Sequence, residues 1–349
     1  MNVFQINTSD PGFESFENYY ANHPFSNFFQ SGIFYRFING LENYSPLLLV
    51  CEDENKSIKG SLLAVIQKDN NKFLRYFSSG IIVRGGPLID QDANKDKILE
   101  ILLTNLVKIT KKKALFIQFR NFSDQLHHLT IFKRFHFSFS DHQNLIIETK
   151  SEKEVWNQIS KSKKRQISKS LVQGASIVVH PTIEELHQFY LILRELYKKK
   201  IHKPLPSWAF FQRFFDLCKN PTWGIIRLIK YNDAIIGGIL CPVSSPKTIH
   251  EWYVCGLDNK YNSHGIYPSV LATWSAIDYA CKNGFDFFDF LGLGNPEKDY
   301  GVRDFKLKFG GTLVNYGRFE RINNHPMYWI ASKGYLLLQF VYKLLSKIT

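Results

Sequence analysis

The sequence predicts a folded protein of the α/β (α+β) class, with two domains whose mixed sheets are flanked by helices. Three observations lead to this prediction. The chain has 349 residues, which is long for one hydrophobic core and suits two domains of roughly 150 to 200 residues. Hydrophobic residues make up 44% and aromatic residues 15% of the chain, which excludes an intrinsically disordered protein. Segments with strand and helix periodicity alternate along most of its length.

The first domain is expected over residues 1–150. Aromatic residues at helical spacing over 13–40, interrupted at His23-Pro24, predict two short helices. The turn residues Gly85-Gly86-Pro87 place Arg84 at the end of a strand. The other predicted elements are strands at 47–51, 61–67 and 73–83, an amphipathic helix at 94–110, a strand at 114–119, a helix at 124–132 and a strand at 144–148.

The second domain is expected over residues 151–325. Three consecutive antiparallel strands form a meander, and a long helix and a strand after it form a parallel crossover. Ser207 is the expected N-cap of one helix. The predicted helices are 151–173, 182–199, 207–219 and 265–283, and the predicted strands are 176–179, 223–229, 234–242, 248–255, 286–290 and 312–321.

Charge and cysteine content limit the partners and the compartment. Lys and Arg number 44 against 31 Asp and Glu, a net charge of +13 that favours an anionic partner: nucleic acid, a phosphorylated substrate or an acidic membrane surface. The first residues, MNVFQINTSDPGFESF, lack the pattern of a signal peptide, so we expect the protein in the cytoplasm. Five widely spaced cysteines without a C-x-x-C pair predict reduced thiols and no metal site.

Two basic segments stand out in the second domain. Residues 161–169 contain five Lys or Arg residues and no acid, which predicts either a solvated helix face or contact with phosphates. The loop from Lys200 to Pro206 is also basic, and its prolines stiffen it.

The last segment, 326–349, is strongly apolar but contains Lys333, Gly334, Gln339 and Lys343, so it is too polar for a membrane span. It predicts a helix that docks on the domains or, alternatively, a basic amphipathic contact with the inner membrane surface.

Residues 284–311 are the stretch around which the rest of the chain is organised. A short buried strand at 286–290 leads into a turn at Gly292 and Gly294, whose backbone can come close to a ligand. A basic-aromatic segment, 303–309, follows and ends at Gly310-Gly311. This order suggests a ligand site, although a strand that ends in a glycine-rich turn is also common in ordinary cores.

Several motifs together resemble one family. In the first half they are Gln30-Ser31 and the turn Arg84-Gly85-Gly86-Pro87. In the second half they are Trp156 followed by Lys164-Arg165-Gln166-Ile167, and Phe305-Lys306 followed by Phe309-Gly310-Gly311. With the meander and the GFDFFDF strand, this pattern resembles the FemABX family of cell-envelope aminoacyltransferases and the related FemAB-like acyltransferases.

The resemblance implies two tandem GNAT-like domains without a coiled-coil insertion, and acyl transfer from a donor to an amine acceptor. It implies that Lys306 stabilises the negative charge that builds on the carbonyl oxygen during attack. Phe305 would shape the substrate channel. Asp289 and Asp304 are candidates for a general base, or alternatively structural carboxylates that cap turns.

The remaining site residues are assigned to the two substrates. Arg36 and Arg84 would hold an acceptor diphosphate bidentately, or alternatively form surface ion pairs. Tyr253 and Arg303 are further candidates for binding the acceptor substrate. The basic residues Lys164, Arg165 and Lys200 are candidates for binding the donor.

Two features bear on the identity of the substrates. Arg120-Asn121 stands where many peptidoglycan-bridge enzymes of the family have an aspartate-proline pair, which weakens the expectation of a muramyl-peptide acceptor. The loop from Tyr261 to Pro268 has one glycine and one proline, so it is a poor cradle for the pyrophosphate of coenzyme A.

The sequence therefore predicts an acyltransferase that moves an aminoacyl group from aminoacyl-tRNA to an amine of an anionic, peptidoglycan-type envelope precursor. It would need no bound cofactor, because aminoacyl-tRNA or acyl-CoA serves as co-substrate. One alternative is an acetyl-CoA-dependent N-acyltransferase acting on an amino sugar or polysaccharide precursor. The other is a non-catalytic basic binding protein. The group moved, the acceptor and the oligomeric state remain open at this stage.

Overall fold

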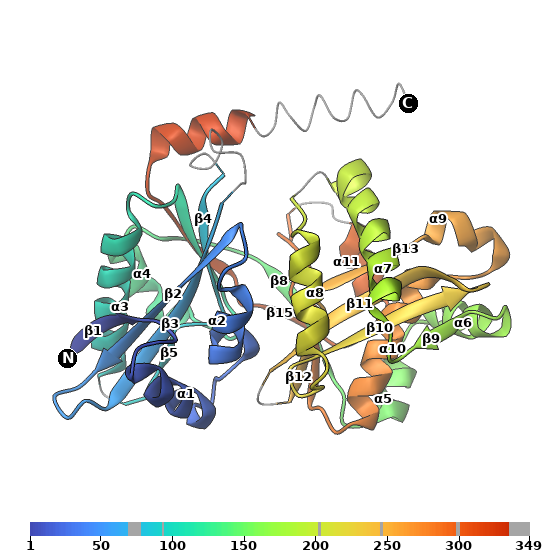
Figure 1. The fold of residues 1–349 in the computed structure, drawn as a ribbon, viewed down its shortest axis with the longest axis horizontal. Coiled ribbons are helices and arrows are strands. Elements are labelled where there is room, and N and C mark those ends of the chain that lie inside the picture. Colours follow the sequence, from blue (N-terminus) through green and yellow to red (C-terminus); the bar gives the residue numbers. More distant parts are fainter. Residues whose placement is uncertain (69–77, 93, 202–203, 245–246, 298–300, 335–349) are drawn as a thin grey trace. The chain divides into compact units, whose positions relative to one another are not determined.

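The computed structural model describes residues 1–68, 78–92, 94–201, 204–244, 247–297 and 301–334. The chain forms two units (Figure 1). The first consists of Met1–His142 together with Asn315–Thr349, and the second of Gln143–Val314. Each unit is built on an eight-stranded mixed sheet with helices packed against it, which confirms the predicted fold class.

The sheet of the first unit has the strand order β1-β2-β3-β4-β6-β16-β7, with β5 paired to β3. All pairs are antiparallel except β4 with β6. Its elements are β1 (Asn2–Ile6), α1 (Gly12–Asn22), η1 (Phe28–Gln30), α2 (Gly32–Ile38), β2 (Tyr44–Glu52), β3 (Ile58–Gln67), β4 (Gly80–Arg84), β5 (Leu88–Ile89), α3 (Lys95–Thr110), β6 (Phe116–Arg120), η2 (Leu126–His128), α4 (Leu129–Arg134), β7 (Ser138–Ser140) and β16 (Arg318–Ile322).

Two motifs from the first half of the sequence meet in this unit. Gln30 is fully buried, and its amide donates to Leu63 O and Arg84 O at 2.9 Å each and accepts from Leu63 N at 2.8 Å. It thereby ties η1 to β3 and to the turn that follows β4. A Cβ on Gly86 would lie 2.4 Å from the Gln30 side chain, so a larger residue would displace this contact. The Gln30 side chain thus holds the Arg84–Pro87 turn in place.

The sheet of the second unit has the strand order β15-β8-β14-β12-β11-β10-β9, with β13 paired to β11. Here β12 and β14 are the parallel pair. Its elements are β8 (Gln143–Glu148), α5 (Glu152–Gln158), α6 (Lys161–Val172), β9 (Ser176–Val178), α7 (Ile183–Leu196), η3 (Tyr197–Ile201), α8 (Trp208–Leu217), β10 (Gly224–Tyr231), β11 (Ala234–Ser244), β12 (Thr248–His250), β13 (Tyr253–Gly256), α9 (Asp258–Tyr261), η4 (Asn262–His264), α10 (Pro268–Lys282), β14 (Phe287–Asp289), α11 (Gly301–Leu307) and β15 (Thr312–Asn315).

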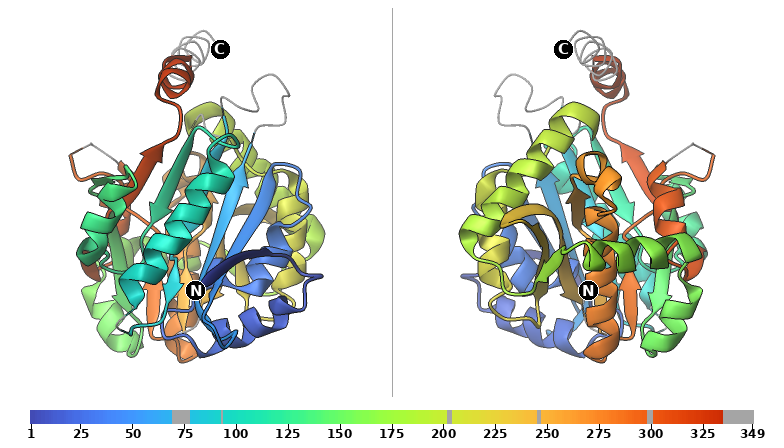
Figure 2. Two further views of the ribbon diagram at one scale, coloured as in Figure 1. Left: turned by 90° about the vertical axis from the view of Figure 1, so that its left-hand side faces the viewer. Right: turned by 90° about the vertical axis from the view of Figure 1, so that its right-hand side faces the viewer.

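Helices cover both faces of this second sheet (Figures 1 and 2). Neighbouring residues of a strand point to opposite faces. A Cβ on Gly237 would meet Pro268 of α10, and one on Gly238 would meet Phe189 of α7. The helices α10 and α7 therefore pack on opposite faces, and α6 lies against α10.

Both boundaries between the units differ from the predicted ones. The predicted strand 144–148 was assigned to the first domain, but β8 pairs with β14 and belongs to the second unit. The predicted strand 312–321 is divided into β15 and β16, and β16 pairs with β6 and β7 of the first unit. The units therefore divide at 142/143 and 314/315 instead of the predicted 150 and 325, because strand pairing, not position along the chain, decides membership.

The end of the chain is helical over residues 325–334, where Tyr328 packs edge-on against Phe116 of β6 with ring centroids 6.0 Å apart. The rest of the predicted terminal helix, and residues 73–77 of a predicted strand, lie outside the described residues. Within the described part of the chain, no helix is both long enough and apolar enough to cross a membrane.

Candidate active site

The second sheet forks where β12 leaves β14. The two strands pair in parallel up to His250 and Asp289, and Glu251 N still donates to Asp289 O at 2.8 Å. The next residue turns away, since Trp252 N donates to Leu240 O of β11 at 3.0 Å. From Tyr253 onward β13 pairs with β11. The single strand predicted at 248–255 is thus two strands separated by a bend at Glu251 and Trp252.

Lys306 lies at this fork. Its residue is 8% exposed, although Leu307 and Lys308 beside it are exposed. The ammonium donates to Phe290 O at 2.8 Å and to Gly292 O at 3.2 Å, and its Nζ lies 3.0 Å from Glu251 Oε1. The two carbonyl contacts are hydrogen bonds, and the contact with Glu251 is an ion pair. The structure thus places Lys306 in a buried position with three polar contacts at the end of β14.

Glu251 is the acidic partner that the sequence did not single out. Its side chain is 2% exposed, and burial raises the pKa of its carboxyl, an effect that the nearby Lys306 ammonium partly offsets. Thr273 of α10 lies 3.5 Å from its second oxygen. A carboxylate within the largely apolar strand segment IHEWYVC was the available signal, because an acid is rarely buried without a partner.

The glycine turn after β14 is tied down by side chains. Leu291, Gly292 and Gly294 have φ angles of 53°, 126° and 84°, a region that glycine tolerates and leucine does not favour. Asp289 Oδ1 accepts from Leu291 N at 2.7 Å, which holds the unfavourable residue in place. Arg303 donates to the carbonyls of Leu293, Asn295 and Pro296. The predicted turn is confirmed, and Arg303 is engaged with its backbone.

Asp289 belongs to a buried polar network behind the fork. It accepts from Asn144 Nδ2 at 2.7 Å, and its other oxygen lies 3.4 Å from His250 Nδ1. His250 Nε2 in turn lies 2.7 Å from Ser244 Oγ. Burial alone would raise the pKa of Asp289, but hydrogen bonds from His250, Asn144 and Leu291 N lower it below its ordinary value. Asp289 thus caps a turn, as the structural alternative predicted, whereas Asp304 is exposed.

Phe305 and Lys306 are adjacent in sequence but have different surroundings. Phe305 packs edge-on against Phe309 with centroids 5.4 Å apart. The Nζ of Lys163, a residue of α6, lies 3.8 Å from the centroid of its ring. Lys306 instead has its Nζ 5.4 Å from the centroid of Phe290. Phe305 therefore joins α11 to α6, while Lys306 points to the fork.

The N-terminus of α10 is the place where a GNAT enzyme would bind the pyrophosphate of coenzyme A. Here it is occupied by the chain itself. Asp258 accepts from Ser269 N at 3.2 Å through one oxygen and from Ser269 Oγ through the other. Tyr267 N donates to Ser170 Oγ of α6 at 2.9 Å. A negative charge already caps this helix.

The predicted donor-binding residues lie on two helical segments of the second unit. Arg165 and Lys200 are exposed. Lys164 is half-buried and donates to Asn157 O at 3.2 Å. Lys161, Arg165 and Lys169 recur every four residues and form an exposed stripe along α6. Tyr253, predicted to bind substrate, packs near the rings of Phe210 and Phe211 at the start of β13.

The two arginines predicted to hold a diphosphate lie in the first unit. Arg36 forms an ion pair with Glu17, and its guanidinium lies 5.3 Å from the Phe13 ring centroid. Its surroundings are those of the surface-ion-pair alternative. Arg84 ends β4 as predicted, and its guanidinium lies 5.5 Å from the Phe29 ring centroid.

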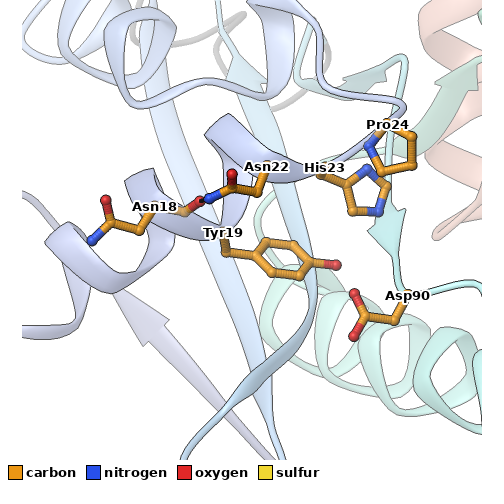
Figure 3. A pocket seen from close by; sticks show the side chains of 6 residues that line it. All are labelled: Asn18, Tyr19, Asn22, His23, Pro24 and Asp90. Atoms are coloured by element: carbon orange, nitrogen blue, oxygen red, sulfur yellow. Dashed lines mark hydrogen bonds between the residues drawn. The ribbon is translucent and has the colours of Figure 1, made fainter.

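A separate open hollow of about 360 Å³ lies on the first unit. Figure 3 shows the Tyr19 ring extending towards Asp90, with His23 and Pro24 beside it. Burial, together with the negative charge of Asp90, raises the pKa of Tyr19. None of the predicted site residues lines this hollow, which is formed by Asn18, Tyr19, Asn22, His23, Pro24 and Asp90.

Comparison with known proteins supports the predicted fold. The family model described as the acetyltransferase (GNAT) domain matches residues 159–306, which include the fork, α10 and Lys306. A search of curated proteins finds no match.

Solved structures resemble the whole chain. FemX has a TM-score of 0.68 at 15% identity, over 95% of this chain and 99% of its own. A tandem GNAT protein from the clavulanic acid biosynthesis pathway gives 0.57 at 7% identity, over 93% and 98%. L-PGS from Bacillus licheniformis gives 0.55 at 10% identity, over 93% and 96%. The chain therefore contains a region that matches the acetyltransferase (GNAT) domain model, and its fold is similar to those of FemX and of a tandem GNAT protein.

Proposed function

We propose that this protein is an acyltransferase that moves an aminoacyl group from aminoacyl-tRNA to an amine of an anionic cell-envelope precursor. The observation that carries the choice of donor is the Asp258 carboxylate on the N-terminus of α10. A pyrophosphate at that position would meet a negative charge, and the Ser269 N–H there is already hydrogen-bonded to Asp258. The net charge of +13 and the exposed stripe on α6 favour a polyanionic donor such as tRNA.

The chemistry is assigned to the fork. The acceptor amine attacks the ester carbonyl of the donor and forms the amide bond, and the bond between that carbon and the 3′ or 2′ oxygen of the terminal ribose breaks. The proton that the amine loses passes, directly or through water, to the ribose oxygen, which leaves as a hydroxyl. Negative charge collects on the carbonyl oxygen in the transition state. Of the three Lys306 contacts, the one to Gly292 O is the longest, at 3.2 Å. In our proposal, Lys306 gives up its hydrogen bond to Gly292 O and donates to the oxyanion instead. Glu251 and Phe290 O keep the ammonium in place.

Glu251 gives this arrangement its charge balance. Glu251 Oε1 lies 3.0 Å from Lys306 Nζ, so an acidic group stands beside the buried ammonium. A positive charge at this position can stabilise an oxyanion. The C-terminal domain of a putative lysylphosphatidylglycerol synthetase shares the fold, and its name gives a lysyl derivative of an anionic phospholipid, which accords with an anionic acceptor.

A second candidate is an acetyl-CoA-dependent N-acyltransferase, which the matching acetyltransferase family model favours. A direct comparison separates the two. Purified protein is titrated with coenzyme A and with aminoacylated tRNA at 50 and 200 mM salt. Salt-sensitive tRNA binding with no coenzyme A binding is expected. Micromolar binding of coenzyme A together with no salt-sensitive affinity for charged tRNA would overturn the aminoacyl donor.

The acceptor is tested in cells. Mass spectrometry of envelope precursors, with and without the protein, should show one species whose mass increases by an amino acid residue. A mass increase of one acetyl group would instead favour the second candidate.

A further inference from the structure

Lys163 points into the second unit from a helix whose other basic residues face outward. The residue is 5% exposed, whereas Lys161, Arg165 and Lys169 are exposed. Lys163, Ile167 and Ser170 are the buried residues of α6, and their spacing of four and three places them on one face. The basic run is thus not uniformly a solvated surface, because one of its lysines is directed inward.

The ammonium of Lys163 faces aromatic rings. Its Nζ lies 3.8 Å from the centroid of Phe305 and 5.3 Å from that of Phe309. Ring faces attract a cation, but they offer no oxygen or nitrogen lone pair to its three N–H groups. Within the described part of the chain, the side chain makes no ion pair and no hydrogen bond to nitrogen or oxygen. Its donors are therefore available to a ligand.

Asp258 is the acidic group whose charge acts on Lys163, although no ion pair joins the two side chains in the described part of the chain. Asp258 and Lys308 act on it with opposite signs. Both oxygens of Asp258 already accept from Ser269. Burial lowers the pKa of Lys163 to about 8. Within the described residues, the N–H groups of Lys163 therefore lack an oxygen acceptor, and a ligand oxygen would supply one.

We propose that Lys163 is an anion-binding site for a phosphate ester group of the acyl donor. A phosphate oxygen supplies the hydrogen-bond acceptor that this ammonium lacks. The site also lies at the start of a twelve-residue helix, where Ser160 is the N-cap and Ser162 Oγ lies 3.2 Å from Ser160 Oγ. The positive end of the helix dipole favours the same ligand.

The site links donor binding to the catalytic segment. Lys163 contacts Phe305, the residue next to Lys306, and Ser160 N donates to Lys308 O at 2.9 Å. A phosphate held at Lys163 would therefore fix the donor relative to α11. This inference rests on the proposed acyl transfer, and it singles out Lys163 within the basic run 161–169.

The melting temperature of the Lys163→Met variant and its affinity for phosphate esters distinguish a ligand site from a cation with a structural role. Lys163→Met keeps the apolar stem and its ring contacts and removes the charge. Lys153→Met, at an exposed position of α5, is the matched control for the lost charge. A ligand site predicts that Lys163→Met melts at a higher temperature than the wild type and yet binds phosphate esters at least about tenfold more weakly. A lower melting temperature with unchanged affinity would overturn the proposal.

Three probes identify the source of the phosphate: an RNA acceptor-stem hairpin ending in single-stranded CCA, coenzyme A and inorganic pyrophosphate. Each is tested for binding and for protection of Lys163 against acetylation by an amine-reactive ester at pH 7.5, read by peptide mass spectrometry. RNA protection, with a salt slope shallower by about one in Lys163→Met, is the expected result.

The outcomes separate this inference from the proposed function. If coenzyme A protects Lys163 and RNA does not, the phosphate site stands and the aminoacyl donor fails. If RNA binds to the wild type and to Lys163→Met equally, the phosphate site fails and the donor stands. If no probe protects Lys163, the site is overturned.

Discussion

The single variant Lys306→Met is expected to lose both stability and activity, whereas replacing Glu251 together with Lys306 should restore the stability but not the activity. The single variant leaves the Glu251 carboxylate, 2% exposed, without its cation. Breaking a buried pair in this way costs about 3 to 5 kcal/mol when the remaining group stays charged. Burial already raises the pKa of Glu251, so the carboxyl can take up a proton, and we expect a loss of about 2 to 3 kcal/mol at pH 7.

The pH dependence of this loss has a definite sign. In Lys306→Met the pKa of Glu251 rises further above its value in the unfolded chain, so between these two values the native state binds more protons. Stability then falls as pH rises through that window. The deficit of the variant should therefore be smaller at pH 5 than at pH 7, as measured by urea unfolding at both values.

The double variant Lys306→Met/Glu251→Gln removes the buried charge and should recover most of the stability. Its transfer activity should stay about 2 to 4 kcal/mol below the wild type in activation free energy, since the oxyanion contact is still missing. The Lys153→Met control should match the wild type in both measurements. Near-wild-type transfer by the double variant would refute the catalytic assignment, and a single variant as stable as the double one would refute the coupling.

Three further predictions follow from other contacts. The pKa of Lys163, lowered by burial from 10.5 to about 8, corresponds to roughly 3 kcal/mol before solvent screening, and the ring faces return about 1 to 2. Lys163→Met should thus raise the free energy of unfolding by about 1 kcal/mol at pH 7. Between pH 8 and 10.5 the Lys163 side chain keeps its proton only in the unfolded chain, so the wild type should gain stability there and the variant should not. Thermal melts in which the variant is the less stable protein would contradict this prediction. Asp258→Ala should cost about 1 kcal/mol through loss of the α10 cap and should increase coenzyme A affinity in calorimetric titration, whereas unchanged coenzyme A binding would count against the capped-helix argument. Gln30→Leu should cost about 2 to 4 kcal/mol in urea unfolding, because three buried backbone groups lose their partner, and a loss below about 1 kcal/mol would show that the Arg84 turn does not depend on it.

Local patterns were sufficient for much of the fold. Periodicity located the helices α3, α7, α8 and α10, because an apolar stripe every three or four residues is a property of one segment. The glycines at 292 and 294 predicted the turn after β14, since a positive φ is a local requirement. Boundaries between the units did not follow from such patterns, because β8 and β16 each join the sheet of the other half through pairing partners more than one hundred residues away.

The sequence by itself determined the α/β class, the tandem arrangement implied by its motifs, and Lys306 as the residue to test. Only the tertiary structure decided the surroundings of that residue. Glu251, 55 positions earlier in the chain, forms an ion pair with Lys306, and Asp258 caps α10. Unlike the exposed residues of its basic run, Lys163 points inward and packs over the Phe305 ring. Whether a charged side chain is exposed, paired or left for a ligand depends on which distant segments fold against it, and no local spacing records that.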